Sequence, residues 1–254
     1  MTYSKWDERS RARARDPVGK PVKPAAKVHF MPKLDRIPYF DPRSREHPVS
    51  EVLPRSTTAL PTYKLWRLDE RNDQGQEGAC VGFGVGHRLA AAPLEVSGID
   101  AAWSHRLYKE AQKIDPWPGE NYEGTAVLAG IKVSIRMGHV YSYRWCFSLE
   151  DYIKAVLLEG PVLVGTNWMD SMWDPDPDTH ILDCRGEVSG GHCYIIRGVN
   201  TRLKKFRITN SWGKDWGYNG DASITFADWQ KYMMPEGEGA VLFEKKVGEL
   251  PPAR

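Results

Sequence analysis

Four side chains that are far apart in the sequence have the types that thiol-based acyl transfer requires. A thiol that attacks a carbonyl needs an imidazolium beside it, a group that holds the imidazole in one tautomer, and donors aimed at the developing oxyanion. Gln74, Cys80, His192 and Asn210 supply candidates for these parts, in that chain order. We expect Cys80 at the start of a helix, where the macrodipole favours a thiolate and a protonated His192 would lower the thiol pKa further.

The local sequences around these residues form three blocks. Residues 72–80 read Asn-Asp-Gln-Gly-Gln-Glu-Gly-Ala-Cys, residues 189–199 read Ser-Gly-Gly-His-Cys-Tyr-Ile-Ile-Arg-Gly-Val, and residues 206–220 read Phe-Arg-Ile-Thr-Asn-Ser-Trp-Gly-Lys-Asp-Trp-Gly-Tyr-Asn-Gly. They are similar to the Gln-Gly-x-Cys-Gly-Ser-Cys-Trp block, the histidine strand and the Asn-Ser-Trp-Gly block of the papain family of cysteine peptidases. The histidine and the asparagine follow the cysteine by 112 and 130 residues, close to the separation in that family. The resemblance covers residues 60–246.

The resemblance implies a role for each matching residue. Gln74 would offer its side-chain amide to the oxyanion, together with the backbone N–H of Cys80. His192 would act as general base and then as general acid. Asn210 would accept the other ring N–H of His192, and Trp212 would shield that hydrogen bond from water.

Two glycines are candidates for substrate binding. By the same resemblance, residues 122–125 would line the non-primed side of the cleft, which holds the acyl half of a substrate, and Gly124 belongs to that loop. Gly191, beside the histidine, would leave a side pocket open. An alternative of equal weight is that Gly124 only permits the turn that enters the next helix.

The chain also departs from the family pattern. Glu77 stands where the family has a cysteine that pairs in secreted members, so that disulfide cannot form, which fits a reducing compartment. Val81 replaces the usual Trp after the nucleophile. In place of the long helical propeptide, the chain has the Pro-rich residues 1–60. In these respects it resembles papain-like proteins of bacteria and their phages.

The composition is that of a globular protein, with 254 residues of which 41% are apolar. No stretch approaches the roughly 20 apolar residues of a membrane helix, and residues 1–30 carry charges where a signal peptide would be apolar. We therefore expect a cytoplasmic protein without membrane contact. The four cysteines have no Cys-x-x-Cys spacing, so we expect no metal, and the chemistry needs no organic cofactor.

The first 60 residues are expected to form a basic, Pro-rich extension. Residues 1–61 hold 13 Lys and Arg against 7 Asp and Glu, and nine of the eighteen prolines. Prolines exclude long helices, and only residues 5–15 could form a short basic helix. A solvated tail is favoured over a docking site for an acidic partner, and nucleic acid is not expected because no aromatic residues alternate with the arginines.

The remaining sequence predicts helices first and strands afterwards. Helices are expected over residues 80–92, 103–112, 125–137 and 149–159, and strands over 162–165, 193–199, 206–209, 222–225 and 240–246, with a loop over 168–178. This order indicates an α+β protein. By the resemblance, residues 61–140 form a helical lobe with the nucleophile, and residues 141–254 form an antiparallel β-barrel-like lobe with the histidine and asparagine.

These expectations lead to one main hypothesis and two alternatives. The main hypothesis is a cysteine-type endopeptidase that hydrolyses polypeptides through a thioester. The alternatives are a catalytically silent module that binds a peptide or protein partner, and a thiol amidase or acyltransferase that acts on a non-protein amide, because fold and triad do not fix the substrate. The sequence names neither the physiological substrate, the source organism nor the oligomeric state.

Overall fold

The structure is a computed structural model that describes residues 32–55, 60–119 and 121–244. The described residues belong to one compact unit. The predicted basic helix within residues 5–15, and with it the prediction of an acidic partner for the arm, lies outside the described residues. The expected division of the chain into an N-terminal extension, a helical lobe and a β-rich lobe, with boundaries at residues 60 and 140, stays a prediction.

Three helices make up most of the chain between the nucleophile block and residue 136. They are α1 (Cys80–Ala90), α2 (Ala101–Gln112) and α3 (Val127–Arg136). A fourth helix, α4 (Leu149–Leu158), begins at a capping box, in which Ser148 and Asp151 satisfy each other's backbone N–H groups. All four helices lie where the sequence predicts them, within a few residues at each end.

Seven strands form one antiparallel sheet in the described part of the chain. The path runs β2-β7-β3-β4-β5-β6, with β1 paired to β4. The strands are β1 (Tyr63–Leu65), β2 (Val140–Trp145), β3 (Val162–Met169), β4 (Val188–Asn200), β5 (Lys205–Thr209), β6 (Asp221–Thr225) and β7 (Glu238–Glu244). Short helical segments are Ser44–Glu46, Val49–Glu51, Asp170–Met172, α5 (Phe226–Asp228) and Trp229–Met233.

The predicted α+β class is confirmed, with two corrections. Among the described strands no pairing joins β2 to β6, so the sheet is not closed into the barrel that the resemblance implies. The predicted loop over residues 168–178 starts too early, because β3 continues through Trp168 to Met169. Strands β1 and β2 are not foreseen, since Lys64 and the polar residues of β2 interrupt an apolar pattern.

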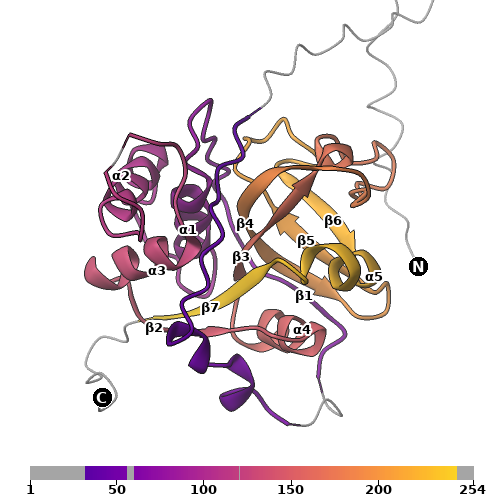
Figure 1. Ribbon diagram of the computed structural model, residues 1–254. Helices are drawn as coiled ribbons and strands as arrows, with labels where there is room; N and C mark the ends of the chain where they lie inside the picture. The colour runs from indigo at the N-terminus through magenta and orange to yellow at the C-terminus, as the bar shows by residue number, and fades with distance from the viewer. Residues whose placement is uncertain (1–31, 56–59, 120, 245–254) are drawn as a thin grey trace, which may run out of the picture. The chain divides into compact units, whose positions relative to one another are not determined.

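Strand β4 separates two hydrophobic clusters. Alternate side chains of a strand point to opposite faces, so Cys193 and Ile195 pack with the three helices while Tyr194 and Ile196 pack with α4 and the other strands. Figure 1 shows α1, α2 and α3 on one side and β4, β5 and β6 on the other. The start of α1 and the start of β4 therefore lie at the junction of the two groups.

Close backbone packing fixes the position of α1. A Cβ atom on Gly82 would lie 2.3 Å from the backbone oxygen of Ser104 in α2, and one on Gly84 would lie 2.8 Å from the sulfur of Cys193 in β4. The glycines of this helix, which cost helix propensity, are thus required by the approach of its neighbours. In the described residues no helix is long and apolar enough to cross a membrane.

We predict that Gly82→Ala destabilises the protein although alanine is the better helix former. The backbone oxygen of Ser104, 2.3 Å from the added carbon, cannot move without shifting α2, and such overpacking costs about 1–3 kcal/mol. Urea unfolding of both proteins measures the difference. An unchanged or higher free energy of unfolding for the variant would show that α1 and α2 are not packed this closely.

Candidate active site

Cys80 is the first residue of α1 and is completely buried. Its backbone N–H precedes the helical hydrogen-bond ladder, and its sulfur receives hydrogen bonds from the backbone N–H groups of Asp35 and Cys193. Burial raises the pKa of the thiol to about 11, although these two donors act in the opposite direction. In this arrangement the sulfur is a neutral thiol at pH 7.

His192, in β4, and Asn210, directly after β5, lie in contact. Nε2 of His192 donates to Oδ1 of Asn210 at 2.7 Å. The same oxygen accepts from the backbone N–H of Ser211, also at 2.7 Å. Because a backbone N–H can only donate, the Asn210 atom facing it must be oxygen, and Nε2 of the imidazole must then carry the proton. Nδ1 is left as the basic nitrogen, without a hydrogen-bond partner among the described residues.

Aromatic rings surround the imidazole. The ring centroid of Trp212 lies 4.9 Å from that of His192, and the ring of Trp168 meets the imidazole edge-on, also at 4.9 Å. Tyr194 stacks on it at 5.8 Å. This burial lowers the pKa of His192 to about 4, against the hydrogen bond to Asn210, so the imidazole is neutral at pH 7.

Gln74 is held by the residue that follows Asn210. Its backbone N–H donates to the carbonyl of Ser211 at 2.9 Å, and its Oε1 accepts from the Ser211 hydroxyl at 2.7 Å. Nε2 donates to the carbonyl of Glu77 at 2.9 Å and to that of Lys33 at 3.1 Å. Because carbonyls only accept, these two contacts fix the amide nitrogen on the side of the nucleophile segment. The second acceptor belongs to the N-terminal segment.

This segment, residues 33–37, we call the strap. It runs between the helices and the strands (Figure 1), and pairs with both sides through its backbone. The N–H of Arg36 donates to the carbonyl of Gly191 at 2.9 Å, the N–H of Thr125 donates to the carbonyl of Asp35 at 3.2 Å, and that of Ile37 donates to Thr125 at 3.0 Å. The strap therefore joins the helical side to the strand side beside Cys80.

The two predicted substrate-binding glycines both lie against the strap. A Cβ atom on Gly191 would lie 2.1 Å from the backbone oxygen of Arg36, and one on Gly124 would lie 1.9 Å from that of Asp35. Gly124 also has a φ of +90°, which the turn into α3 requires. The turn considered for Gly124 is thus present, and its role in substrate binding stays a prediction.

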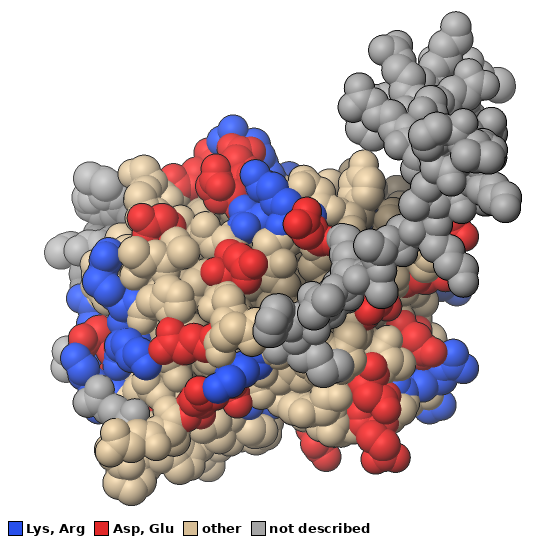
Figure 2. Space-filling model, turned by 90° about the horizontal axis from the view of Figure 1, so that it is seen from above, with Lys and Arg blue, Asp and Glu red and all other residues tan. Residues whose placement is uncertain are grey.

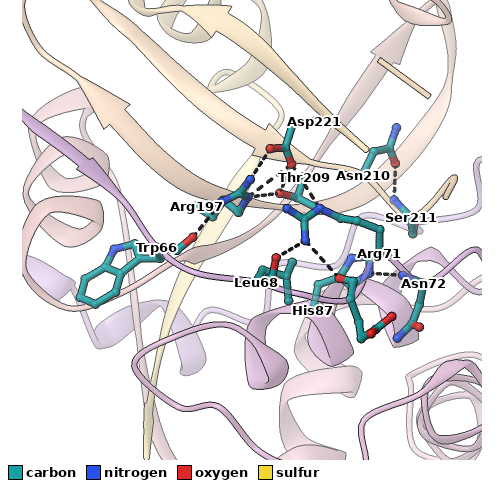
Figure 3. Close-up of polar contacts among 11 residues, drawn as sticks. Trp66, Leu68, Arg71, Asn72, His87, Arg197, Thr209, Asn210, Ser211 and Asp221 are labelled. Atoms are coloured by element: carbon teal, nitrogen blue, oxygen red, sulfur yellow. Dashed lines mark hydrogen bonds and ion pairs between the residues drawn. The ribbon is translucent and has the colours of Figure 1, made fainter. Parts of the chain in front are cut away.

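A cluster of buried charges holds the chain around Asn210 in place (Figure 3). Asp221, in β6, pairs with the guanidinium of Arg197, and its Oδ1 lies 3.6 Å from Nε of Arg71. The hydroxyl of Thr209 donates to the same carboxylate at 2.7 Å. Since Thr209 directly precedes Asn210, the cluster fixes the end of β5 from which the carboxamide projects.

The positions that depart from the family pattern have distinct environments. The carboxylate of Glu77 pairs with His105 and Lys109 of α2, at 2.7 Å in each case, which ties the loop before α1 to α2. Val81 is buried in the helical cluster. The described part of the chain contains no group of three or more His, Cys, Asp or Glu side chains arranged to hold a metal ion.

Sequence reasoning missed three features of this site. The sequence pattern predicts Trp168 in a loop, yet it packs against His192. The resemblance gives Ser211 no role beyond its place in the Asn-Ser-Trp-Gly block, although it bonds to the carboxamides of both Asn210 and Gln74. The strap was missed because its contacts join residues about 40 to 200 positions apart, which no local pattern indicates.

Comparisons with known proteins support the predicted fold. No family model matches the chain. An uncharacterized peptidase C1-like protein of Acanthamoeba polyphaga mimivirus is 23% identical over 208 residues, which are 65% of this chain and 65% of that protein. The crystal structure of xylellain, a cysteine protease from Xylella fastidiosa, has a TM-score of 0.65 at 15% identity and covers 84% of this chain and 96% of its own.

A second solved structure is digestive procathepsin L2 proteinase from Tenebrio molitor larval midgut. Its TM-score is 0.53 at 14% identity, over 77% of this chain and 72% of that one. The predicted resemblance to papain-like C1-type peptidases and the predicted fold are thereby confirmed.

We predict that Asp221→Asn lowers the free energy of unfolding by about 3 kcal/mol, because it leaves two buried guanidinium groups without their counter-charge. Asp183→Asn is the matched control, since Asp183 pairs with Arg185 at the surface, where an ion pair contributes less than about 1 kcal/mol. Urea unfolding measures both variants. Equal stability of the two would mean that the buried cluster does not hold the end of β5.

Proposed function

We propose that this chain, which folds as papain-like cysteine peptidases do, is a cysteine-type endopeptidase that cleaves polypeptides through a thioester on Cys80. The names of its relatives support a hydrolase of this class. The identities are low and the match spans 65% of the mimivirus protein, so the proposal depends mainly on the geometry of the site.

One observation carries the proposal. The side-chain amide of Gln74 already donates to a peptide carbonyl, that of Lys33, while the sulfur of Cys80 meets the N–H of Asp35 in the same strap. A polypeptide backbone is thus held against the thiol with its carbonyl on an amide donor. A substrate peptide in the same groove would meet the same two groups.

The reaction begins when the strap leaves and water enters the groove. Removal of burial lowers the pKa of Cys80 and raises that of His192, so the thiol proton moves to Nδ1 of the imidazole. The thiolate attacks the peptide carbonyl carbon, and the oxyanion forms opposite Nε2 of Gln74 and the backbone N–H of Cys80. As the C–N bond breaks, the Nδ1 proton passes to the leaving amine and the acyl group remains on sulfur.

The second half regenerates the enzyme. His192 takes a proton from water through Nδ1, and the resulting hydroxide attacks the thioester at the same carbonyl position. The C–S bond breaks, the acid product leaves, and the proton returns to the sulfur. Asn210 keeps Nε2 protonated throughout, so that Nδ1 is the nitrogen that transfers protons, and Trp212 limits the access of water to that hydrogen bond.

The strap is held in the wrong direction to be cut. Its chain runs from Lys33, whose carbonyl lies at Gln74, toward Asp35 and Ile37, which pair with Thr125 in the loop that the resemblance assigns to the acyl half. In a cleavable chain the acyl residues come before the carbonyl at Gln74, whereas here they come after it. The strap therefore acts as an inhibitor, and the neutral thiol and imidazole describe a latent enzyme.

We predict that Cys80→Ala abolishes casein hydrolysis, reducing it to the background rate, because no other group can form the thioester. Cys184→Ala is the control, since Cys184 is a buried thiol of the strand-side cluster. It should retain the wild-type rate once folding has been verified by circular dichroism. Turnover by the Cys80 variant would refute the assignment of the nucleophile.

We predict that Arg36→Ala speeds the alkylation of Cys80 by iodoacetamide at pH 7 by roughly tenfold or more. The side chain of Arg36 forms a buried ion pair with Glu238, and breaking such a pair destabilises the closed strap. Peptide mapping by mass spectrometry reports the rate at this cysteine. Arg43→Ala, the control, removes a guanidinium that is 86% exposed, and should leave the rate unchanged. Equal rates in all three proteins would exclude the strap as an inhibitor.

A further inference from the structure

Cys193 is a buried thiol beside the nucleophile for which the proposed reaction has no use. It follows His192 in β4, and its side chain belongs to the same buried cluster as Cys80. Cys146 and Cys184 belong to the other cluster, on the far side of β4. Since the described residues include every cysteine of the chain, and all four are free, Cys193 is the one thiol that shares the surroundings of Cys80.

The sulfur of Cys80 lies against the backbone of Cys193. It accepts a hydrogen bond from the N–H of Cys193. Among the described residues Nδ1 of His192 has no hydrogen-bond partner, so in the closed state the nucleophile is bonded to the strand backbone and not to the imidazole. The sulfur of Cys193 is only three covalent bonds from the nitrogen that makes this contact. Rotation about its Cα–Cβ bond therefore changes its distance from the sulfur of Cys80.

A glycine of α1 brings the thiol of Cys193 onto the helix face that carries Cys80. Gly84 follows Cys80 by four residues, so their Cβ positions lie on one face of α1, about 5–6 Å apart. A Cβ atom on Gly84 would lie 2.8 Å from the sulfur of Cys193. The sulfur of Cys193 thus lies over the row of α1 that begins with the nucleophile.

The approach of the two thiols does not depend on the strap. Cys80 belongs to α1 and Cys193 to β4, and these elements pack together at Gly84. The Cα of Cys193 is one bond from the donor nitrogen, and the Cα of Cys80 is two bonds from the acceptor sulfur. Their hydrogen bond therefore brings the two Cα atoms near the range of about 4.4–6.8 Å that a disulfide requires.

Burial keeps both thiols unreactive while the strap is closed. It raises the pKa of Cys80 to about 11 and that of Cys193 well above its usual value. After burial, the charge of Cys80 is the largest cause that raises the pKa of Cys193, which agrees with the short distance between them. Opening of the strap admits water to Cys80, which lowers its pKa and lets the thiolate form.

We propose that Cys193 is the resolving thiol of a reversible disulfide with Cys80, formed when the open protein meets a hydroperoxide. The bond itself does not depend on the proposed function, whereas its effect on catalysis rests on that function, because the disulfide engages the attacking sulfur. It also protects the nucleophile, since a sulfenic acid that condenses with a neighbouring thiol does not proceed to the irreversible sulfinic acid.

The oxidation takes two steps. The Cys80 thiolate attacks one oxygen of hydrogen peroxide, the O–O bond breaks, and the products are a sulfenic acid on Cys80 and a hydroxide that takes up a proton. The sulfur of Cys193 then attacks the sulfenic sulfur, the S–O bond breaks, and the thiol proton leaves with the hydroxide as water. The two thiols together lose two electrons, which reduce the peroxide to water. A dithiol reverses the change by thiol–disulfide exchange.

A small neutral oxidant suits this site. Figure 2 shows Lys and Arg intermixed with Asp and Glu over the face that it presents, without a continuous field of one sign. Such a face does not concentrate a charged oxidant. Hydrogen peroxide is uncharged, so it needs no surface field to reach the sulfur once the strap opens.

The test maps the bond in the full-length protein. Wild type and Arg36→Ala, in which the strap is loosened, are treated with hydrogen peroxide, blocked with N-ethylmaleimide and digested without reductant. Mass spectrometry should find the peptides of Cys80 and Cys193 joined with the loss of two hydrogen atoms, and dithiothreitol should separate them. The link should form roughly tenfold faster in Arg36→Ala, because its strap is open in a larger fraction of molecules.

Cys193→Ala tests the resolving residue. After peroxide treatment, dithiothreitol should return wild type to its own untreated rate of casein hydrolysis. Cys193→Ala should stay at about a tenth or less of its own untreated rate, because its Cys80 reaches the sulfinic acid. Comparison of each protein with its own untreated rate removes any effect of the substitution on basal activity. Cys184→Ala, the control, lacks a thiol of the other cluster and should recover as wild type does.

The outcomes separate this proposal from the proposed function. A link between Cys80 and Cys193 in a protein that cleaves no casein in either redox state would support the disulfide and overturn the peptidase function. Cleavage by the reduced protein, with no link in wild type or in Arg36→Ala, would overturn the disulfide alone. A link from Cys80 to Cys146 or Cys184 would overturn it as well. The mapping needs no variant of Cys193, so poor folding of Cys193→Ala leaves the test intact.

Discussion

The hydrogen bond from Nε2 of His192 to Oδ1 of Asn210 is the interaction on which the rest of the site depends. It assigns the ring proton, and so leaves Nδ1 as the basic ring nitrogen. Ser211 fixes the sense of this bond by donating its N–H to the same oxygen, while its hydroxyl bonds to Oε1 of Gln74. One short segment after β5 therefore orients both the imidazole of His192 and the carboxamide of Gln74.

Burial leaves both the thiol and the imidazole neutral, the opposite of the charged pair that catalysis would need. With residues 33–37 in place, the pKa of Cys80 is raised to about 11 and that of His192 is lowered to about 4, in each case chiefly through desolvation. The polar framework is already assembled, because Gln74 and Asn210 have their partners. In the proposed enzyme, the latent and the active state thus differ in the access of water and substrate, and the arrangement of the framework is common to both.

A single buried pair anchors the strap. The side chains of Arg36 and Glu238 are 0% and 1% exposed, so removal of either partner would leave an uncompensated charge in the interior. Glycines at positions 165 and 191 make room for the side chain and the backbone of Arg36.

The sequence by itself determined the order and spacing of the three blocks, the four main helices and the α+β class, because these depend on local patterns and on residue types at fixed separations. It could not reveal the strap, the packing of Trp168 on His192, or the pairing of Arg36 with Glu238 across 202 positions. Those contacts arise only when β3, β4 and β7 bring distant segments together. The open edge of the sheet was likewise decided by tertiary strand pairing, which no single segment encodes.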